Sequence, residues 1–137
     1  MAGKPHKRLE AWRKSMDLVV RIYQATARFP AEERFGLVSQ IRRAALSVPS
    51  NVAEGAARGS SRFFTSALQI ARASLSELDT QIIIAQRLGY LSERELEGLT
   101  ASVEEIERIV NGLISSVRRR LAAGVVASGL ILALGLL

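Results

Sequence analysis

The sequence contains no cysteine, and it has few aromatic residues and few prolines. The absence of cysteine excludes disulfide bonds, thiolate metal sites and a cysteine nucleophile, and it fits a reducing compartment such as the cytoplasm. An aromatic content of 5%, with abundant alanine, leucine, arginine and serine, favours helices over a β-sandwich or a β-barrel. At 137 residues, the chain is long enough for one domain with a sizeable core.

Residues that enzymes use for chemistry are also scarce. The single histidine, His6, lies in a polar N-terminal stretch, so we expect a surface side chain rather than a catalytic or metal-binding group. The carboxylates Glu104, Glu105 and Glu107 fall on the exposed side of an expected helix, where we expect them only to be solvated. No glycine-rich phosphate loop or nucleophile motif is present. We therefore expect a protein that is not an enzyme and that holds no cofactor and no metal.

Positive charge, in contrast, is in excess. The formal net charge is +6 at pH 7, most of the basic residues are arginines, and most of them lie within residues 1–88. Arginine makes forked contacts to phosphate and carboxylate groups. A basic protein of this size is a candidate to bind nucleic acid or an anionic membrane. When only the charge is considered, the alternative is a basic surface that binds no such ligand and is simply solvated.

The first part of the chain predicts a basic arm followed by a helix. Residues 1–8 are polar and basic, and we expect a flexible arm. The first helix is expected from Leu9 to about Arg28, because Pro30 disfavours helical geometry in the residue before it. Its apolar face is expected where apolar side chains recur three and four residues apart. The residues of this expected face are Leu9, Trp12, Met16, Val19 and Tyr23.

A short connection of about one helical turn then leads to a second helix, which we expect to begin near Phe35 or Gly36. The helical periodicity continues across Pro49. A proline inside a helix removes one backbone hydrogen bond and clashes with the preceding turn, so we expect a kink or a break there. Gly55 and Gly59 are candidate ends for this helix.

The third helix is expected from Ser60 or Ser61, either of which can cap it, to Gly89. Its apolar residues alternate in steps of four and three over three heptads, which is typical of a bundle seam. The residues of this seam are Phe64, Leu68, Ala71, Leu75, Leu78, Ile82 and Ala85.

Ser92 and Glu95 form a capping-box pattern that predicts the start of a fourth helix, continuing to about Arg120. Acidic residues early in this helix and arginines at its end suit the two ends of the helix dipole. Four helices joined by short connections predict an all-α, antiparallel up-down four-helix bundle over residues 9–120.

An uncharged apolar tail begins at Leu121, directly after three arginines, and continues to Leu137. As a helix it would span about 26 Å, against a hydrocarbon core of about 30 Å. It therefore predicts a membrane anchor, with the arginines keeping the bundle cytoplasmic. The alternatives are an extension of the fourth helix that packs against neighbouring subunits, and an end without defined structure.

The most specific pattern is an arginine pair followed by a small-residue motif. Arg42 and Arg43 point about 100° apart on a helix, so they serve different purposes. One is expected to face solvent or a ligand, and the other to lie at a helix or subunit interface with Glu54 or Glu77 as its partner. The motif that follows consists of Ser47, Pro49, Asn51, Glu54 and Gly55. Its polar members either satisfy backbone groups freed by the proline or form a polar interface site.

Five short segments resemble one known family. They are LEAW (9–12), FPAEERFGL (29–37), SQIRRAA (39–45), SVPSNVAEG (47–55) and LGYL (88–91). In this order they resemble the four-helix bundle family that includes the proteins encoded by 23S rRNA intervening sequences. That family is similar in turn to the accessory variability determinant of diversity-generating retroelements. The resemblance implies a bundle assembled as a ring, typically a homopentamer, with a basic surface suited to RNA or DNA and no established enzymatic activity.

Together these features predict a non-enzymatic, oligomeric bundle that binds nucleic acid (RNA or DNA). The contacts are expected to go mainly to the phosphate backbone of the nucleic acid, so the sequence specificity should be weak. In a ring, each basic patch is repeated by symmetry. The alternative is a structural or membrane-associated scaffold whose arginines serve subunit contacts and lipid head groups. The candidate nucleic-acid-binding residues are Lys7, Arg8, Arg13, Lys14, Arg42, Arg43, Arg58 and Arg62.

Overall fold

The structure is a computed structural model that describes Lys4, His6 and residues 9–124. The described residues form α-helices and one short 3-10 helix, without any β-strand. The elements are α1 (Glu10–Thr26), η2 (Ala31–Glu33), α2 (Leu37–Arg58), α3 (Ser61–Arg87) and α4 (Glu93–Ala122).

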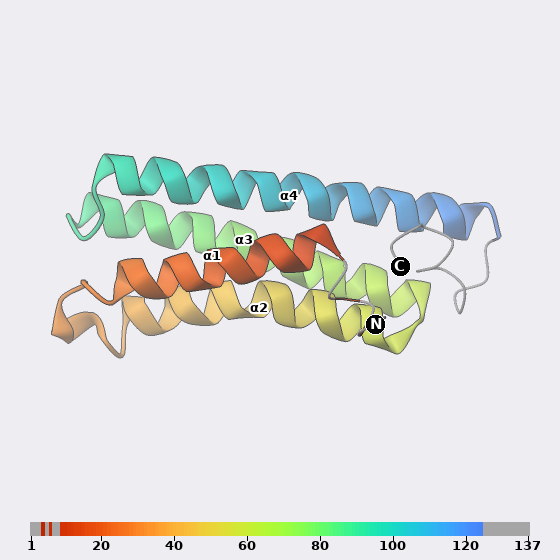
Figure 1. The fold of residues 1–137 in the computed structure, drawn as a ribbon, viewed down its shortest axis with the longest axis horizontal. Coiled ribbons are helices and arrows are strands. Elements are labelled where there is room, and N and C mark those ends of the chain that lie inside the picture. Colours follow the sequence, from red (N-terminus) through yellow and green to blue (C-terminus); the bar gives the residue numbers. More distant parts are fainter. Residues whose placement is uncertain (1–3, 5, 7–8, 125–137) are drawn as a thin grey trace.

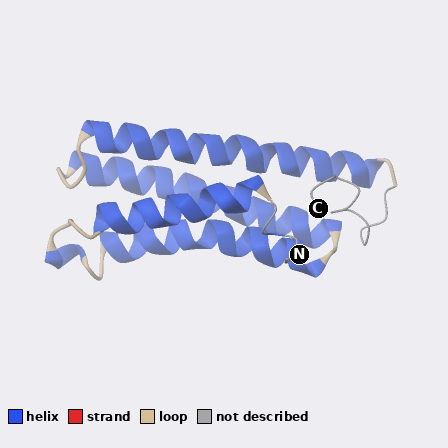
Figure 2. Cartoon of the chain, viewed as in Figure 1, coloured by secondary structure: helices blue, strands red, loops and turns tan. Residues whose placement is uncertain are grey.

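The helices form an antiparallel up-down bundle. Each helix packs chiefly against two neighbours, in the order α1–α2, α2–α3, α3–α4 and α4–α1, and loops occur only at the two ends of the bundle (Figure 2). The all-α fold and the arrangement of the helices predicted from the sequence are therefore confirmed. Helix α1 begins short of the end where α2 connects to α3, and α4 ends at that same end of the bundle (Figure 1).

The core is centred on α3. The seven apolar residues predicted as its seam are all buried, and none is more than 1% exposed. Their spacing of three and four residues keeps them on one side of the helix over its whole length, so they meet residues of the other helices. Ile41 and Val48 of α2 and Val103 and Val110 of α4 complete this core.

Helix α1 differs from the prediction in the face that it buries. Met16 and Tyr23 are 41% and 37% exposed, and Trp12 and Val19 are only partly buried. Of the residues on the expected apolar face, only Leu9 is fully buried. The residues of α1 that are buried are Ala11, Ser15, Leu18, Ile22, Ala25 and Thr26.

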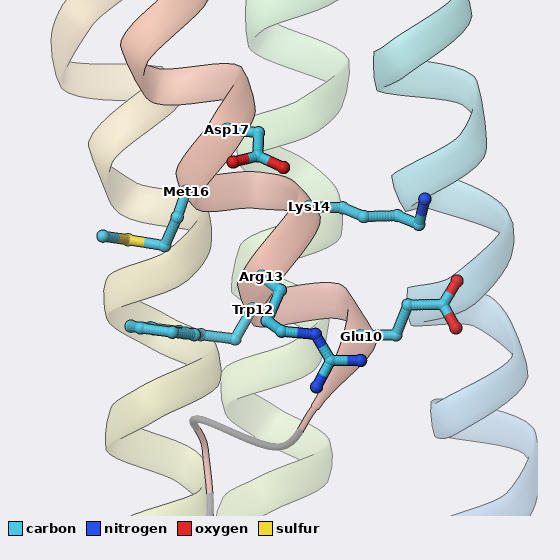
Figure 3. Close-up of a pocket in the computed structure, with 6 residues that line it drawn as sticks. All are labelled: Glu10, Trp12, Arg13, Lys14, Met16 and Asp17. Atoms are coloured by element: carbon cyan, nitrogen blue, oxygen red, sulfur yellow. The ribbon is translucent and has the colours of Figure 1, made fainter.

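The physical reason is that small residues bring α1 close to the other helices. Ser15 donates a hydrogen bond to the Trp12 carbonyl at 2.9 Å, and Thr26 donates one to the Ile22 carbonyl at 2.7 Å. Both hydroxyl groups are thereby satisfied within the helix and can be buried at little cost. The bulkier stripe is left on the flank of α1, where Trp12 and Met16 extend on the side of α2 (Figure 3).

Helix α2 is unbroken through Pro49, so the break considered from the sequence is absent. The proline ring is buried in the bundle, and the turn around it is tied by side chains. Asn51 donates to the Ser47 carbonyl at 2.8 Å and to Ser47 Oγ at 3.0 Å. Ser47 Oγ lies 2.8 Å from Ser74 Oγ of α3. Glu54 pairs with Arg58, one helical turn further along α2.

Gly55 does not end α2 but lets it approach α3 closely. A Cβ atom at this position would lie 2.7 Å from Ala67 Cβ and 3.1 Å from a ring carbon of Phe64. The helix ends at Gly59, whose φ of 68° is in the left-handed region that glycine adopts readily. Ser60 then caps α3 by accepting a hydrogen bond from the Phe63 N–H.

The capping box at the start of α4 is confirmed. Ser92 Oγ accepts a hydrogen bond from the Glu95 N–H, and Glu95 Oε1 accepts one from the Ser92 N–H, each at 3.0 Å. Glu95 also pairs with Arg28 of α1. The pKa of Glu95 is lowered, first by the hydrogen bond from the Ser92 backbone and further by the charge of Arg28.

We expect the contribution of Glu95 to stability to depend on pH. A carboxylate whose pKa is lower in the folded state stabilises the fold above its unfolded pKa, and this contribution disappears as the pH falls through the folded pKa. Because the pair is solvent-exposed, its size should be below about 1 kcal/mol. Urea unfolding should therefore show wild type more stable than Glu95→Gln at pH 7, with the difference decreasing as the pH is lowered below 4.5. A difference that stays constant with pH would contradict this role for the carboxylate.

Helix α4 ends at Ala122, two residues beyond the predicted end. Among the described residues, none of the helices combines the length and the apolar character that crossing a bilayer requires. Residues 125–137, which make up most of the apolar tail, lie outside the described residues, and so do Lys7 and Arg8. The predicted anchor and basic arm therefore stay predictions.

Candidate nucleic-acid interface

The arginine pair that the sequence singled out is engaged within the bundle. Arg42 Nε donates to Thr26 Oγ1 at 2.9 Å, and its guanidinium carbon lies 4.3 Å from the centroid of the Tyr23 ring. Arg43 Nη2 contacts Glu77 Oε1 at 2.8 Å, and Glu77 is one of the two partners expected for this pair. Both guanidinium groups thus help to join neighbouring helices. Because these contacts already engage them, they are weaker candidates for a contact with nucleic acid than arginines that do not join helices.

Lys14 is also held by a neighbouring helix. Its Nζ lies 2.7 Å from Glu105 Oε1, and it extends from α1 toward α4 (Figure 3). The hydrogen bond and the opposite charge raise the pKa of Lys14 and lower the pKa of Glu105. The preceding residue, Arg13, is exposed on α1.

Arg58 and Arg62 lie together at the turn between α2 and α3. Arg58 Nη2 lies 3.2 Å from Glu54 Oε1, and its guanidinium carbon lies 4.8 Å from the centroid of the Phe63 ring. Arg62 is exposed, and Phe63 beside it is 52% exposed. The turn therefore presents two guanidinium groups and an aromatic ring to solvent.

The structure brings three further arginines to this end of the bundle. Arg72 of α3 donates to Asn111 of α4 at 3.3 Å. Because α3 and α4 are antiparallel, the residues before Arg72 in α3 and the residues after Asn111 in α4 lead toward the same end of the bundle. The last turn of α4 therefore lies at the end of the bundle where α3 begins, and it extends past the start of α3 (Figure 1). The arginines of this turn are Arg118, Arg119 and Arg120.

We call the group Arg58, Arg62, Arg118, Arg119 and Arg120 the basic end. The two stretches that form it carry almost no compensating charge, since the sequence has no acidic residue from Gly55 to Ser76 and none after Glu107. Arg118 and Arg119 are exposed, and Arg120 is partly exposed. Glu54, which pairs with Arg58, is the one carboxylate that the described contacts place at this group. The excess of cations creates a positive potential at that end of the molecule.

The rest of the bundle does not share this charge. At the opposite end, arginines alternate with the glutamates of η2 and of the first turn of α4. In the middle of α4, burial raises the pKa of Glu107, and the negative charges of Asp79 and Glu104 raise it further. Within the described part of the chain, no group of histidine, cysteine and carboxylate side chains is arranged to hold a metal ion.

The sequence thus predicts Arg58 and Arg62 as nucleic-acid-binding residues. For Arg118–Arg120 it predicts only an interaction with the helix dipole and a place before the apolar tail. The signal was present in the predicted topology, because an antiparallel bundle places the end of its fourth helix beside the connection between its second and third helices. Arg42, Arg43 and Lys14 were chosen for their charge, and the sequence alone does not show that a neighbouring helix engages them.

The fold and the basic end define the class of protein as an all-α bundle with one strongly cationic end. The chain belongs to the 23S rRNA-intervening sequence protein family, whose model matches residues 7–112. The resemblance carried by the five short segments is therefore confirmed.

A solved structure supports the same fold. The crystal structure of a protein of unknown function from the S23 ribosomal protein family of Bacteroides thetaiotaomicron has a TM-score of 0.69 to this chain, with 23% sequence identity. The match covers 76% of this chain and 97% of the other. At this identity the likeness concerns the fold alone. Among curated proteins, none matches the chain.

Proposed function

We propose that the protein is a non-enzymatic nucleic-acid-binding protein and that its basic end is the binding surface. The observation that carries the proposal is that five arginines from α2, α3 and α4 lie at one end of the bundle, where Glu54 is the one carboxylate that pairs with any of them in the described contacts. Guanidinium groups make bidentate contacts to phosphate oxygens. The family name refers to an intervening sequence of 23S rRNA, which favours RNA as the first ligand to test.

The binding is led by phosphate contacts. Each arginine that neutralises a phosphate releases a counterion, so the affinity falls as salt is added. Phosphate contacts fix the position of the nucleic acid but carry little sequence information. A fluorescence-polarisation titration with a labelled RNA, repeated at several salt concentrations, tests the proposal. No binding at low salt would refute it.

We propose further that copies of the chain assemble through an exposed apolar surface on α1 and α2. This surface is the observation that favours a structural role in addition to nucleic-acid binding. This apolar flank consists of Met16, Val20 and Tyr23 of α1 and Leu46 of α2, all 37–54% exposed. Arg42 stacks on Tyr23, and Leu46 is one helical turn further along α2, so the two helices contribute to one surface. The ring implied by the resemblance would place every basic end on the same rim.

A charge placed on the apolar flank is expected to lower the native mass of the protein. Val20→Glu puts a carboxylate in a surface that, in an assembly, would be removed from water, and an unpaired buried charge is strongly unfavourable. Size-exclusion chromatography with light scattering should show an oligomer for wild type and a smaller species for the variant. Ser115→Glu, which makes the same charge change at an exposed site on α4, away from the apolar flank, should leave the mass unchanged. A monomeric wild-type protein would contradict the assembly.

A further inference from the structure

A hollow in the groove between α2 and α3 lies next to the basic end. Its volume is about 160 Å³, below the roughly 300–1,000 Å³ of pockets for drug-sized ligands. This size limits an occupant to one small group. The residues that line the hollow are Asn51, Glu54, Gly55, Arg58, Phe63, Ser66, Ala67 and Ile70.

One side of the hollow is apolar and accessible. Phe63 and Ile70 are each 52% exposed, although both belong to residue types that normally avoid water. Gly55 of α2 and Ala67 of α3 also line the hollow, at the place where the two helices approach closely. Arg58 holds the Phe63 ring by a cation–π contact, yet the ring remains half exposed. Such a ring is a suitable platform for a flat aromatic ligand.

The other side supplies hydrogen-bonding groups. Both donated hydrogen bonds of the Asn51 amide nitrogen go to Ser47, which leaves Asn51 Oδ1 as an acceptor. Glu54 uses Oε1 for Arg58, so its second oxygen is a further acceptor, and Arg58 adds a cation. This side of the hollow comes from the motif around Pro49, whose function the sequence left open.

From this arrangement we propose that the hollow takes one unpaired nucleobase of the strand that the basic end holds. The base stacks on Phe63, its N–H groups donate to Asn51 and Glu54, and the phosphates beside it contact Arg58 and Arg62. Stacking on an aromatic side chain beside a cationic surface is how many proteins hold single strands. A base inside a duplex is already stacked and paired, so it cannot enter. The inference rests on the proposed function and adds to it a preference for single-stranded nucleic acid.

The test compares a labelled single-stranded RNA with the same RNA in a blunt duplex, by fluorescence polarisation at one low salt concentration. Wild type should bind the single strand more tightly. Phe63→Ala should weaken single-strand binding about tenfold, as expected for one lost stacking contact, while leaving duplex binding unchanged. Phe63→Trp keeps an aromatic platform and should retain the preference. Ile84→Ala, at an exposed position of α3 outside the hollow, is the matched control and should bind as wild type does.

Two results would overturn the nucleobase site while leaving the proposed function intact. In the first, Phe63→Ala binds the single strand as tightly as wild type. In the second, Phe63→Ala weakens single-strand and duplex binding equally, which would show that the ring serves the basic end in general. A wild-type protein that binds neither RNA would instead refute the proposed function, and the nucleobase site with it.

Discussion

Replacing Arg118, Arg119 and Arg120 together by serine is expected to remove most of the affinity for RNA. These side chains supply three of the five guanidinium groups at the basic end, and no carboxylate follows Glu107 in the sequence. Losing three phosphate contacts should lower the affinity on the order of a hundredfold at about 50 mM salt, and should reduce the slope of log affinity against log salt by about 2.

The matched control for this variant is the triple replacement of Arg34, Arg87 and Arg94 by serine. These arginines are exposed near the opposite end of the bundle, and removing them changes the net charge by the same amount. Fluorescence polarisation over a salt series should show a nearly wild-type affinity and slope for this control. If the two triple variants lost the same affinity, the net charge of the protein would explain the binding and the basic end would not.

Replacing Phe64 by alanine is expected to destabilise the fold by about 3–5 kcal/mol, because it removes a large side chain from the core and leaves a cavity. Phe64 is only 1% exposed, and it lies beside Gly55, where α2 and α3 approach closely. A loss of this size is a large part of the total stability of a small domain.

Urea unfolding followed by circular dichroism measures this loss directly. The neighbouring replacement Phe63→Ala makes the same chemical change at a position that is 52% exposed, and it should change the free energy of unfolding by less than about 0.5 kcal/mol. Equal losses for the two variants would contradict the placement of α3 in the bundle. The small effect at Phe63 also ensures that its RNA-binding test uses a folded protein.

The sequence predicted the fold well where large apolar residues carry the pattern. The seam of α3 and the capping box of Ser92 and Glu95 were both found, because each depends on residues close together in one helix. The core face of α1 was predicted wrongly, since Ala11 and Ser15 are small and mark no clear stripe, whereas Trp12 and Met16 do. Close packing between helices depends on such small residues, and their partners are distant in the sequence.

The same limit applies to the candidate site. Whether an arginine meets a carboxylate on another helix depends on the register between helices, which one helix alone does not specify. Arg43 meets Glu77 across the groove between α2 and α3, and Lys14 meets Glu105 of α4. Arg58 and Arg62 remain at the turn where the chain reverses. The predicted candidate set therefore divides into residues that join helices and residues that lie at the basic end.

Photocrosslinking tests the proposed binding surface most directly, because two exposed phenylalanines mark the two ends of the bundle. Phe63 lies at the basic end, and Phe35, which is 88% exposed, lies at the opposite end. Trypsin releases them in the separate peptides 63–72 and 35–42. After irradiation of the complex with RNA that carries 4-thiouridine, mass spectrometry should find crosslinked nucleotides on peptide 63–72 and few on peptide 35–42. Crosslinks concentrated on peptide 35–42 would contradict binding at the basic end.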